Sequence, residues 1–143
     1  MALVLPGCGG DSAATAESGG APQPKQQAKV EAATGRPCPA QVGAFLKSLG
    51  ALRRQLAAGL SYEQYASRVK TLRGSYDDLP IDRLTLECLR STGTPAEAAL
   101  NKYVDAANTW GECLADASCT STTIEPVLQR KWRLASRSLS EVK

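Results

Sequence analysis

The spacing of apolar residues between positions 38 and 143 restricts the fold more than any other feature. Apolar side chains recur there at intervals of three and four residues, which places them on one face of an α-helix. No stretch alternates apolar and polar residues as a half-buried strand would. The sequence therefore predicts an all-α domain. Four amphipathic segments with short connections predict an antiparallel four-helix bundle with a short extra helix.

Two helices are expected between residues 39 and 80. Pro39 suits a first helical position, and Gly59 is expected to cap the end of this helix. The next four residues, Ser61-Tyr62-Glu63-Gln64, have the pattern of a capping box, in which the serine accepts a hydrogen bond from the backbone and the glutamine reaches back. Asp77-Asp78-Leu79-Pro80 is expected to end the second helix.

The rest of the chain predicts a brief helix, a break and two more long helices. Ile81–Leu89 is a short apolar segment. Ser91-Thr92-Gly93 is expected to interrupt the helical structure. Thr94-Pro95-Ala96-Glu97 combines a cap, an early proline and a glutamate, which marks a helix start. The last helix is expected to begin near Thr122–Pro126. Gly111 lies within an apolar face, which predicts a close approach by another helix.

Residues 9–37 differ sharply from the segment that follows. They are mostly Gly, Ala, Pro, Gln and Ser, and such a composition buries too little apolar surface to offset chain entropy. We therefore expect a disordered, flexible tether with a root-mean-square reach of about 30 Å. The disulfide-stapled helical domain is expected to occupy residues 38–143.

The N-terminal residues 1–8 end in Leu5-Pro6-Gly7-Cys8, followed by Gly-Gly-Asp-Ser. An apolar residue, a small residue and a cysteine before a polar run resemble the lipobox that ends the signal peptide of a bacterial lipoprotein. The resemblance implies cleavage before Cys8, lipidation of Cys8 and attachment to a membrane outside the cytoplasm. Only seven uncharged residues precede Cys8, fewer than a complete signal needs, so the genuine precursor is expected to begin upstream of Met1. The alternative is a disordered N-terminus with one incidental cysteine.

Cysteine parity agrees with the lipoprotein interpretation. The chain has five cysteines, and reserving Cys8 for lipid leaves an even set of four, which allows three pairings. Cys113 and Cys119 are close enough in sequence to close a local turn, which leaves Cys38 to pair with Cys88. A crosslink of that span contributes about 3–4 kcal/mol through the unfolded chain. The alternative, a zinc site with four cysteine ligands, would show closely spaced ligand pairs.

The absence of histidine narrows the possible chemistry. The chain has no His, which excludes Ser-His and Cys-His nucleophile pairs and histidine-ligated haem or zinc. A net charge of +3 is too small and too mixed to indicate a nucleic-acid binder. We therefore expect no catalytic residue, no cofactor and no metal.

Three groups of side chains are candidates for a function. Arg130, Arg133 and Arg137 fall on one side of the last helix and could contact anionic lipid or acidic wall polymers, although an ordinary solvated face is the favoured interpretation. The acidic cluster could serve a hydrolase, but ordinary turn chemistry is favoured; it comprises Asp77, Asp78, Asp82 and Glu87. The aromatic residues could form a stacking platform for a sugar or peptide, but they lie on apolar faces and are expected in the core; they are Tyr62, Tyr65, Tyr76, Tyr103, Trp110 and Trp132.

The sequence favours a monomeric, non-enzymatic binding module of the cell envelope. Lipid on Cys8 would hold it to the membrane, and its partner would be an envelope protein or a wall polymer. One alternative is a hydrolase acting on the cell wall through Asp and Glu, which requires a carboxylate pair facing a cleft. The other is a helical carrier of an apolar ligand, which requires a sizeable apolar cavity.

Overall fold

The structure is a computed structural model that describes residues 38–143. Helices and short connections make up this part of the chain, with no strand in it, so the predicted all-α class is confirmed. The long helices are α1 (Ala40–Ala58), α2 (Tyr62–Asp77), α4 (Thr94–Ala115) and α5 (Ser121–Ser140). Short turns join α2 to α4: η1 (Ile81–Arg83), α3 (Leu86–Cys88) and η2 (Leu89–Gly93). The predicted lipobox remnant (1–8) and tether (9–37) lie outside the described residues.

Local sequence signals set the connection between α1 and α2. Gly59 has a φ of 93°, a backbone conformation that glycine adopts far more readily than other residues. The predicted capping box is confirmed, because Ser61 Oγ accepts from the Gln64 backbone N–H at 3.3 Å and Gln64 Oε1 accepts from that of Ser61 at 3.1 Å. Pro39 precedes α1 instead of starting it.

The predicted break at Ser91-Thr92-Gly93 is wrong. Leu89–Gly93 form a turn of π-helix that continues directly into α4, and Gly93 itself is helical, with φ −61° and ψ −54°. Pro95 has no N–H to donate to the carbonyl of Ser91, four residues earlier. That carbonyl accepts instead from the backbone N–H of Lys143 at 3.1 Å, within the usual range for such a bond. The C-terminal residue thus satisfies a group that the proline leaves open.

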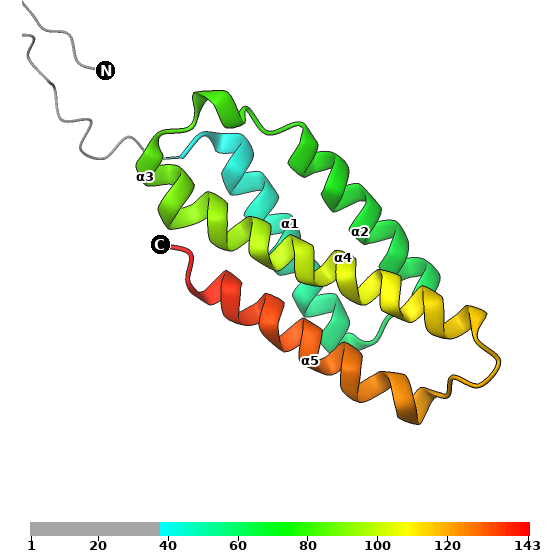
Figure 1. The fold of residues 1–143 in the computed structure, drawn as a ribbon. Coiled ribbons are helices and arrows are strands. Elements are labelled where there is room, and N and C mark those ends of the chain that lie inside the picture. The colour runs from blue at the N-terminus through cyan, green and yellow to red at the C-terminus, as the bar shows by residue number, and fades with distance from the viewer. Residues whose placement is uncertain (1–37) are drawn as a thin grey trace, which may run out of the picture. The chain divides into compact units, whose positions relative to one another are not determined.

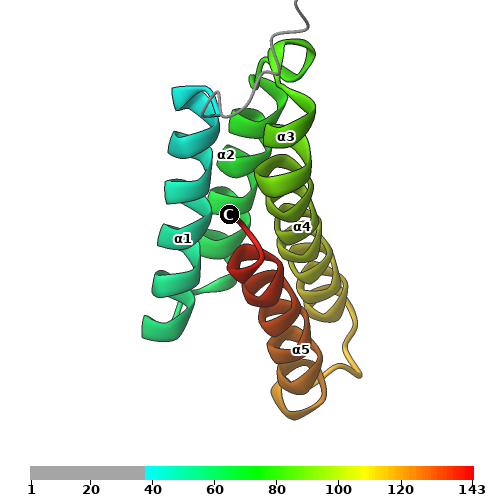
Figure 2. The ribbon, with the colours of Figure 1, turned by 90° about the vertical axis from the view of Figure 1, so that its left-hand side faces the viewer.

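Helix α4 is the centre of the domain. It packs against α1, α2 and α5, and its interface with α5 is the most extensive. Buried alanines on α4 allow this close packing; they are Ala96, Ala99, Ala106 and Ala107. Consecutive long helices run in opposite directions (Figure 1), and α1, α2, α4 and α5 enclose a common core (Figure 2).

Two disulfides tie the ends of these helices. Cys38, just before α1, pairs with Cys88 in α3, and Cys113 at the end of α4 pairs with Cys119 before α5. The pairing is the one that the sequence favoured. The first crosslink joins residues 50 positions apart and the second joins residues 6 apart, so the first removes more conformational freedom from the unfolded chain.

The hydroxyl of Tyr65 joins three of the long helices. Tyr65, on α2, is fully buried, and its Oη donates to the backbone carbonyl of Tyr103 on α4 at 2.9 Å. The same oxygen accepts from Trp132 Nε1 on α5 at 3.0 Å. Burial raises the pKa of Tyr65 far above its usual range, so the hydroxyl keeps its proton and remains a donor.

We predict that Tyr65→Phe lowers the free energy of unfolding by about 1–3 kcal/mol, because it leaves the Trp132 N–H without its buried partner. Urea denaturation followed by circular dichroism measures the change. Tyr62→Phe, on the same helix at a half-buried position, is the matched control and should change stability by less than about 0.5 kcal/mol. Equal effects of the two substitutions would contradict the role assigned to Tyr65.

Candidate binding groove

A surface groove lies where α1 and α4 end and α5 begins. Its volume is about 550 Å³. The lining is mainly apolar and aromatic and includes Leu56, Leu60, Trp110, Leu114, Ile124, Leu128 and Trp132. One of these side chains, Leu114, is 60% exposed.

Both tryptophans of the chain lie in this groove. Trp110 on α4 and Trp132 on α5 are only partly buried, and their ring centroids are 6.1 Å apart in an edge-to-face arrangement. Tyr65 fixes the orientation of the Trp132 ring through the hydrogen bond from Nε1. Tyr62 contacts Trp110 at a centroid distance of 5.7 Å. Tyrosines of α2 therefore hold both tryptophan rings, the aromatic wall of the groove, in place.

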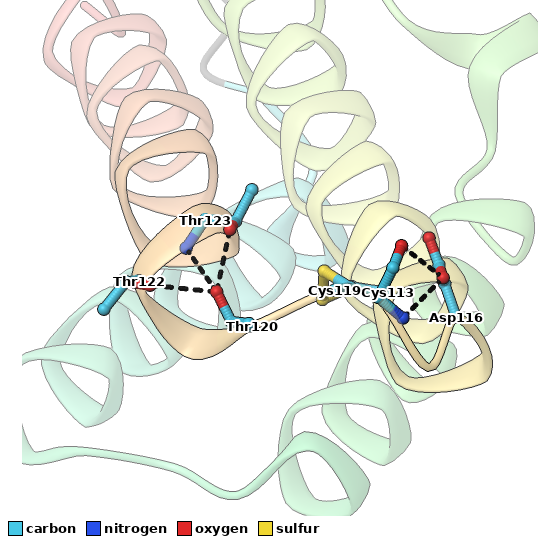
Figure 3. The surroundings of a disulfide bond; sticks show 7 residues. Cys113, Asp116, Cys119, Thr120, Thr122 and Thr123 are labelled. Carbon is cyan, nitrogen blue, oxygen red and sulfur yellow. Dashed lines mark hydrogen bonds between the residues drawn. A yellow bond between two sulfur atoms is a disulfide. The ribbon is translucent and has the colours of Figure 1, made fainter.

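The Cys113–Cys119 disulfide forms part of the wall. Both cysteines line the groove, and the loop between them is ordered by its own hydrogen bonds (Figure 3). Asp116 Oδ1 accepts from the backbone N–H of Ser118 at 2.8 Å and from its hydroxyl at 2.7 Å. Thr120 Oγ1 caps α5 by accepting from the backbone N–H of Thr123 at 3.3 Å. This part of the groove lining is thus ordered by hydrogen bonds between residues close together in the sequence.

The charged side chains of the lining are all acidic. Asp116 and Glu125 line the groove, and no lysine or arginine does. The hydroxyl of Ser118, and then its backbone N–H, lower the pKa of Asp116, so this carboxyl is ionised at neutral pH. The groove therefore combines an apolar floor with negative charge.

The three arginines singled out in the sequence lie elsewhere. Arg130, Arg133 and Arg137 are exposed on α5, and none of them lines the groove. Their neighbour Lys131 forms an ion pair with Asp105 of α4. Contact of these arginines with an anionic surface stays a prediction.

The acidic cluster also lies away from the groove. Asp77, Asp78, Asp82 and Glu87 are exposed at the α2–α4 connection, and none of them lines the groove. The carboxylates that do line it, Asp116 and Glu125, were not singled out from the sequence. They are too far apart along the chain to form a motif, and only the turn between α4 and α5 places both of them at the groove.

The aromatic residues divide into two groups. Tyr65 and Tyr103 are fully buried in the core, as predicted. Tyr62 and Tyr76 are partly buried. Trp110 and Trp132 pack against the core but are only partly buried, and they also line the groove. Trp110 lies near the end of α4, which is the one local signal that could have indicated a position at the edge of the core. Trp132 lies in the middle of α5, and nothing in its local sequence indicates that it borders a groove.

Comparison with known proteins assigns no family. No protein-family model matches the sequence, and no curated protein or solved structure matches it. None of the helices in residues 38–143 has the length and apolar character needed to cross a bilayer. The same residues hold no group of three His, Cys, Asp or Glu side chains that could bind a metal ion. A functional proposal therefore depends on the geometry of the groove.

Gly111 gives the aromatic wall its spacing. A Cβ at this position would lie 2.5 Å from Tyr62 Oη, closer than real contacts allow, and 3.2 Å from Tyr62 Cζ, a tight contact. The predicted close approach at Gly111 is therefore confirmed, and the neighbour is the side chain of Tyr62 on α2.

We predict that Gly111→Ala destabilises the domain by about 0.5–2 kcal/mol, because displacing Tyr62 from its contact with Trp110 costs more than alanine gains in a helix interior. Gly43→Ala in α1 is the control, since nothing lies within 4 Å of a Cβ there. It should stabilise the domain by about 0.5–1 kcal/mol, because alanine favours a helix interior. Urea denaturation gives both values, and tryptophan emission should change in the first variant alone. Stabilisation by both substitutions would refute the packing role of Gly111.

Proposed function

We propose that the chain is a non-enzymatic binding module of a bacterial lipoprotein, held outside the cytoplasm by lipid on Cys8. In this proposal the groove between α1, α4 and α5 receives an apolar group of the ligand. The groove carries the proposal, because its volume of about 550 Å³ lies within the range of about 300–1,000 Å³ that is typical of small-molecule sites. Its mainly apolar, aromatic lining is also typical of such sites.

The architecture supports a location outside the cytoplasm. We propose that the helices form an antiparallel four-helix bundle, monomeric and stapled at both ends by disulfides. Disulfides persist in oxidising compartments and are rare in the cytosol, which agrees with export through a signal that ends at Cys8. Residues 9–37 would then be the spacer between the membrane and the bundle. The exposed arginines of α5 would face anionic lipid or an acidic wall polymer.

Binding is favoured over hydrolysis by the state of the carboxyl groups in the groove. A glycosidase-type mechanism needs one carboxyl that holds a proton at working pH and therefore has a raised pKa. Ser118 lowers the pKa of Asp116 instead. Glu125, the other carboxylate of the lining, is exposed to solvent.

Tryptophan fluorescence gives a direct test of binding, because both tryptophans line the groove. We predict a saturable change in emission when the full chain is titrated with 1-octanol. Ile124→Asn places an amide in the lining and should weaken binding about tenfold, which corresponds to a loss of about 1.4 kcal/mol. Leu139→Asn, at a partly buried position of α5 outside the groove, is the matched control and should bind normally. Absence of saturable binding, or equal loss in both variants, would refute the proposed site.

The lipid anchor is tested separately. We predict that mass spectrometry of the protein isolated from its native membrane finds an acylated Cys8 as the N-terminal residue. Globomycin, which blocks cleavage of lipoprotein signals, should leave an uncleaved precursor. An intact Met1 or a free Cys8 thiol in the native protein would refute the anchor and leave the groove proposal standing.

A further inference from the structure

We infer that the ligand of the groove is an organic cation with an apolar body, such as an alkyl chain that ends in an ammonium group. This inference rests on the proposed function, in which the groove receives an apolar group. It adds the charge of the ligand, which the apolar lining alone does not specify. Three features of the groove carry it: the sign of its charged residues, their lack of ion-pair partners and the presence of two indole rings.

The charge of the groove differs in sign from that of the whole chain. The net charge of the chain is +3, yet Asp116 and Glu125 are the charged residues of the lining. The negative character of the groove is therefore a local property. An acidic pocket on a basic protein attracts cations and repels anions at short range.

Neither carboxylate is neutralised by a basic side chain. Within residues 38–143 the ion pair that forms joins Lys131 to Asp105, which leaves Asp116 and Glu125 without a cationic partner there. Both hydrogen bonds from Ser118 fall on Oδ1 of Asp116. They order the carboxylate and leave Oδ2 able to face a ligand. An ammonium group beside it would gain an attraction that the protein itself does not satisfy.

The two indoles add to the same electrostatic preference. The face of an indole carries negative charge density and attracts ammonium groups, more strongly than tyrosine or phenylalanine rings do. Trp110 and Trp132 lie edge-to-face with centroids 6.1 Å apart, so differently oriented rings border the same hollow. A fatty acid or another anionic amphiphile would meet two carboxylates and two indole rings with no basic side chain in the lining. The groove thus favours a cationic amphiphile over a neutral one, and a neutral one over an anionic one.

Three probes with the same eight-carbon chain separate the effect of charge from that of apolar contact. The full chain is titrated with octyltrimethylammonium, 1-octanol and octanoate below their aggregation concentrations, with tryptophan emission as the signal. The expected order of affinity is cation, alcohol, anion. The cation should bind about 3–10-fold more tightly than the alcohol, as attraction to two exposed carboxylates allows. Raising the salt concentration should reduce this ratio, because exposed charges are screened.

Substitution of the two carboxylates tests their role. In the double variant Asp116→Asn, Glu125→Gln the ratio of cation to alcohol affinity should fall to about 1–2. The matched control is Asp82→Asn, Glu87→Gln, which changes the net charge equally at exposed positions outside the groove and should keep the original ratio. Circular dichroism checks that both variants are folded.

The outcomes separate this inference from the proposed function. If cation and alcohol bind equally, or octanoate binds most tightly, the inferred ligand class is wrong and the apolar groove remains a binding site. If the ratio falls equally in both double variants, net charge accounts for the preference and the inference is again wrong. If none of the three probes binds saturably, the proposed function itself fails.

Discussion

The buried hydroxyl of Tyr65 is the interaction on which the candidate site depends. It connects α2 to the backbone of α4 at Tyr103 and to the indole of Trp132 on α5. A buried polar group is costly unless it is hydrogen-bonded, so the three helices are favoured in the one arrangement that satisfies all of these atoms. That arrangement also orients a ring of the groove. A polar contact in the core thereby determines the geometry of a surface site.

Close packing around α4 places the rest of the groove. The buried alanines of α4 allow α1, α2 and α5 to approach it closely. Gly111 leaves room for Tyr62 beside Trp110. Past the last turn of α4, Cys113–Cys119 closes the connection to α5 and adds the side chains of the loop to the wall. The groove therefore forms where the packed part of α4 ends and the disulfide-closed loop to α5 begins.

Charge and apolar surface in the groove have separate structural origins. The apolar floor comes from the same helix faces that build the core, while Asp116 and Glu125 belong to the loop and to the start of α5. In the proposed function the apolar lining would bind by burial of apolar surface, and the two carboxylates would select the ligand by charge.

The sequence by itself determined the all-α class, the cap at Gly59, the capping box at Ser61 and the favoured disulfide pairs, because these depend on local periodicity, backbone preference and spacing. Tertiary structure alone decided that the chain continues as a helix through Ser91–Gly93. A carbonyl left open by Pro95 is satisfied there by Lys143, from the far end of the chain. It also decided that Trp110 and Trp132 line a groove beside Asp116 and Glu125. Helical periodicity shows which face of a helix is apolar. Only the neighbouring helices decide which residues on that face are buried and which remain at the surface.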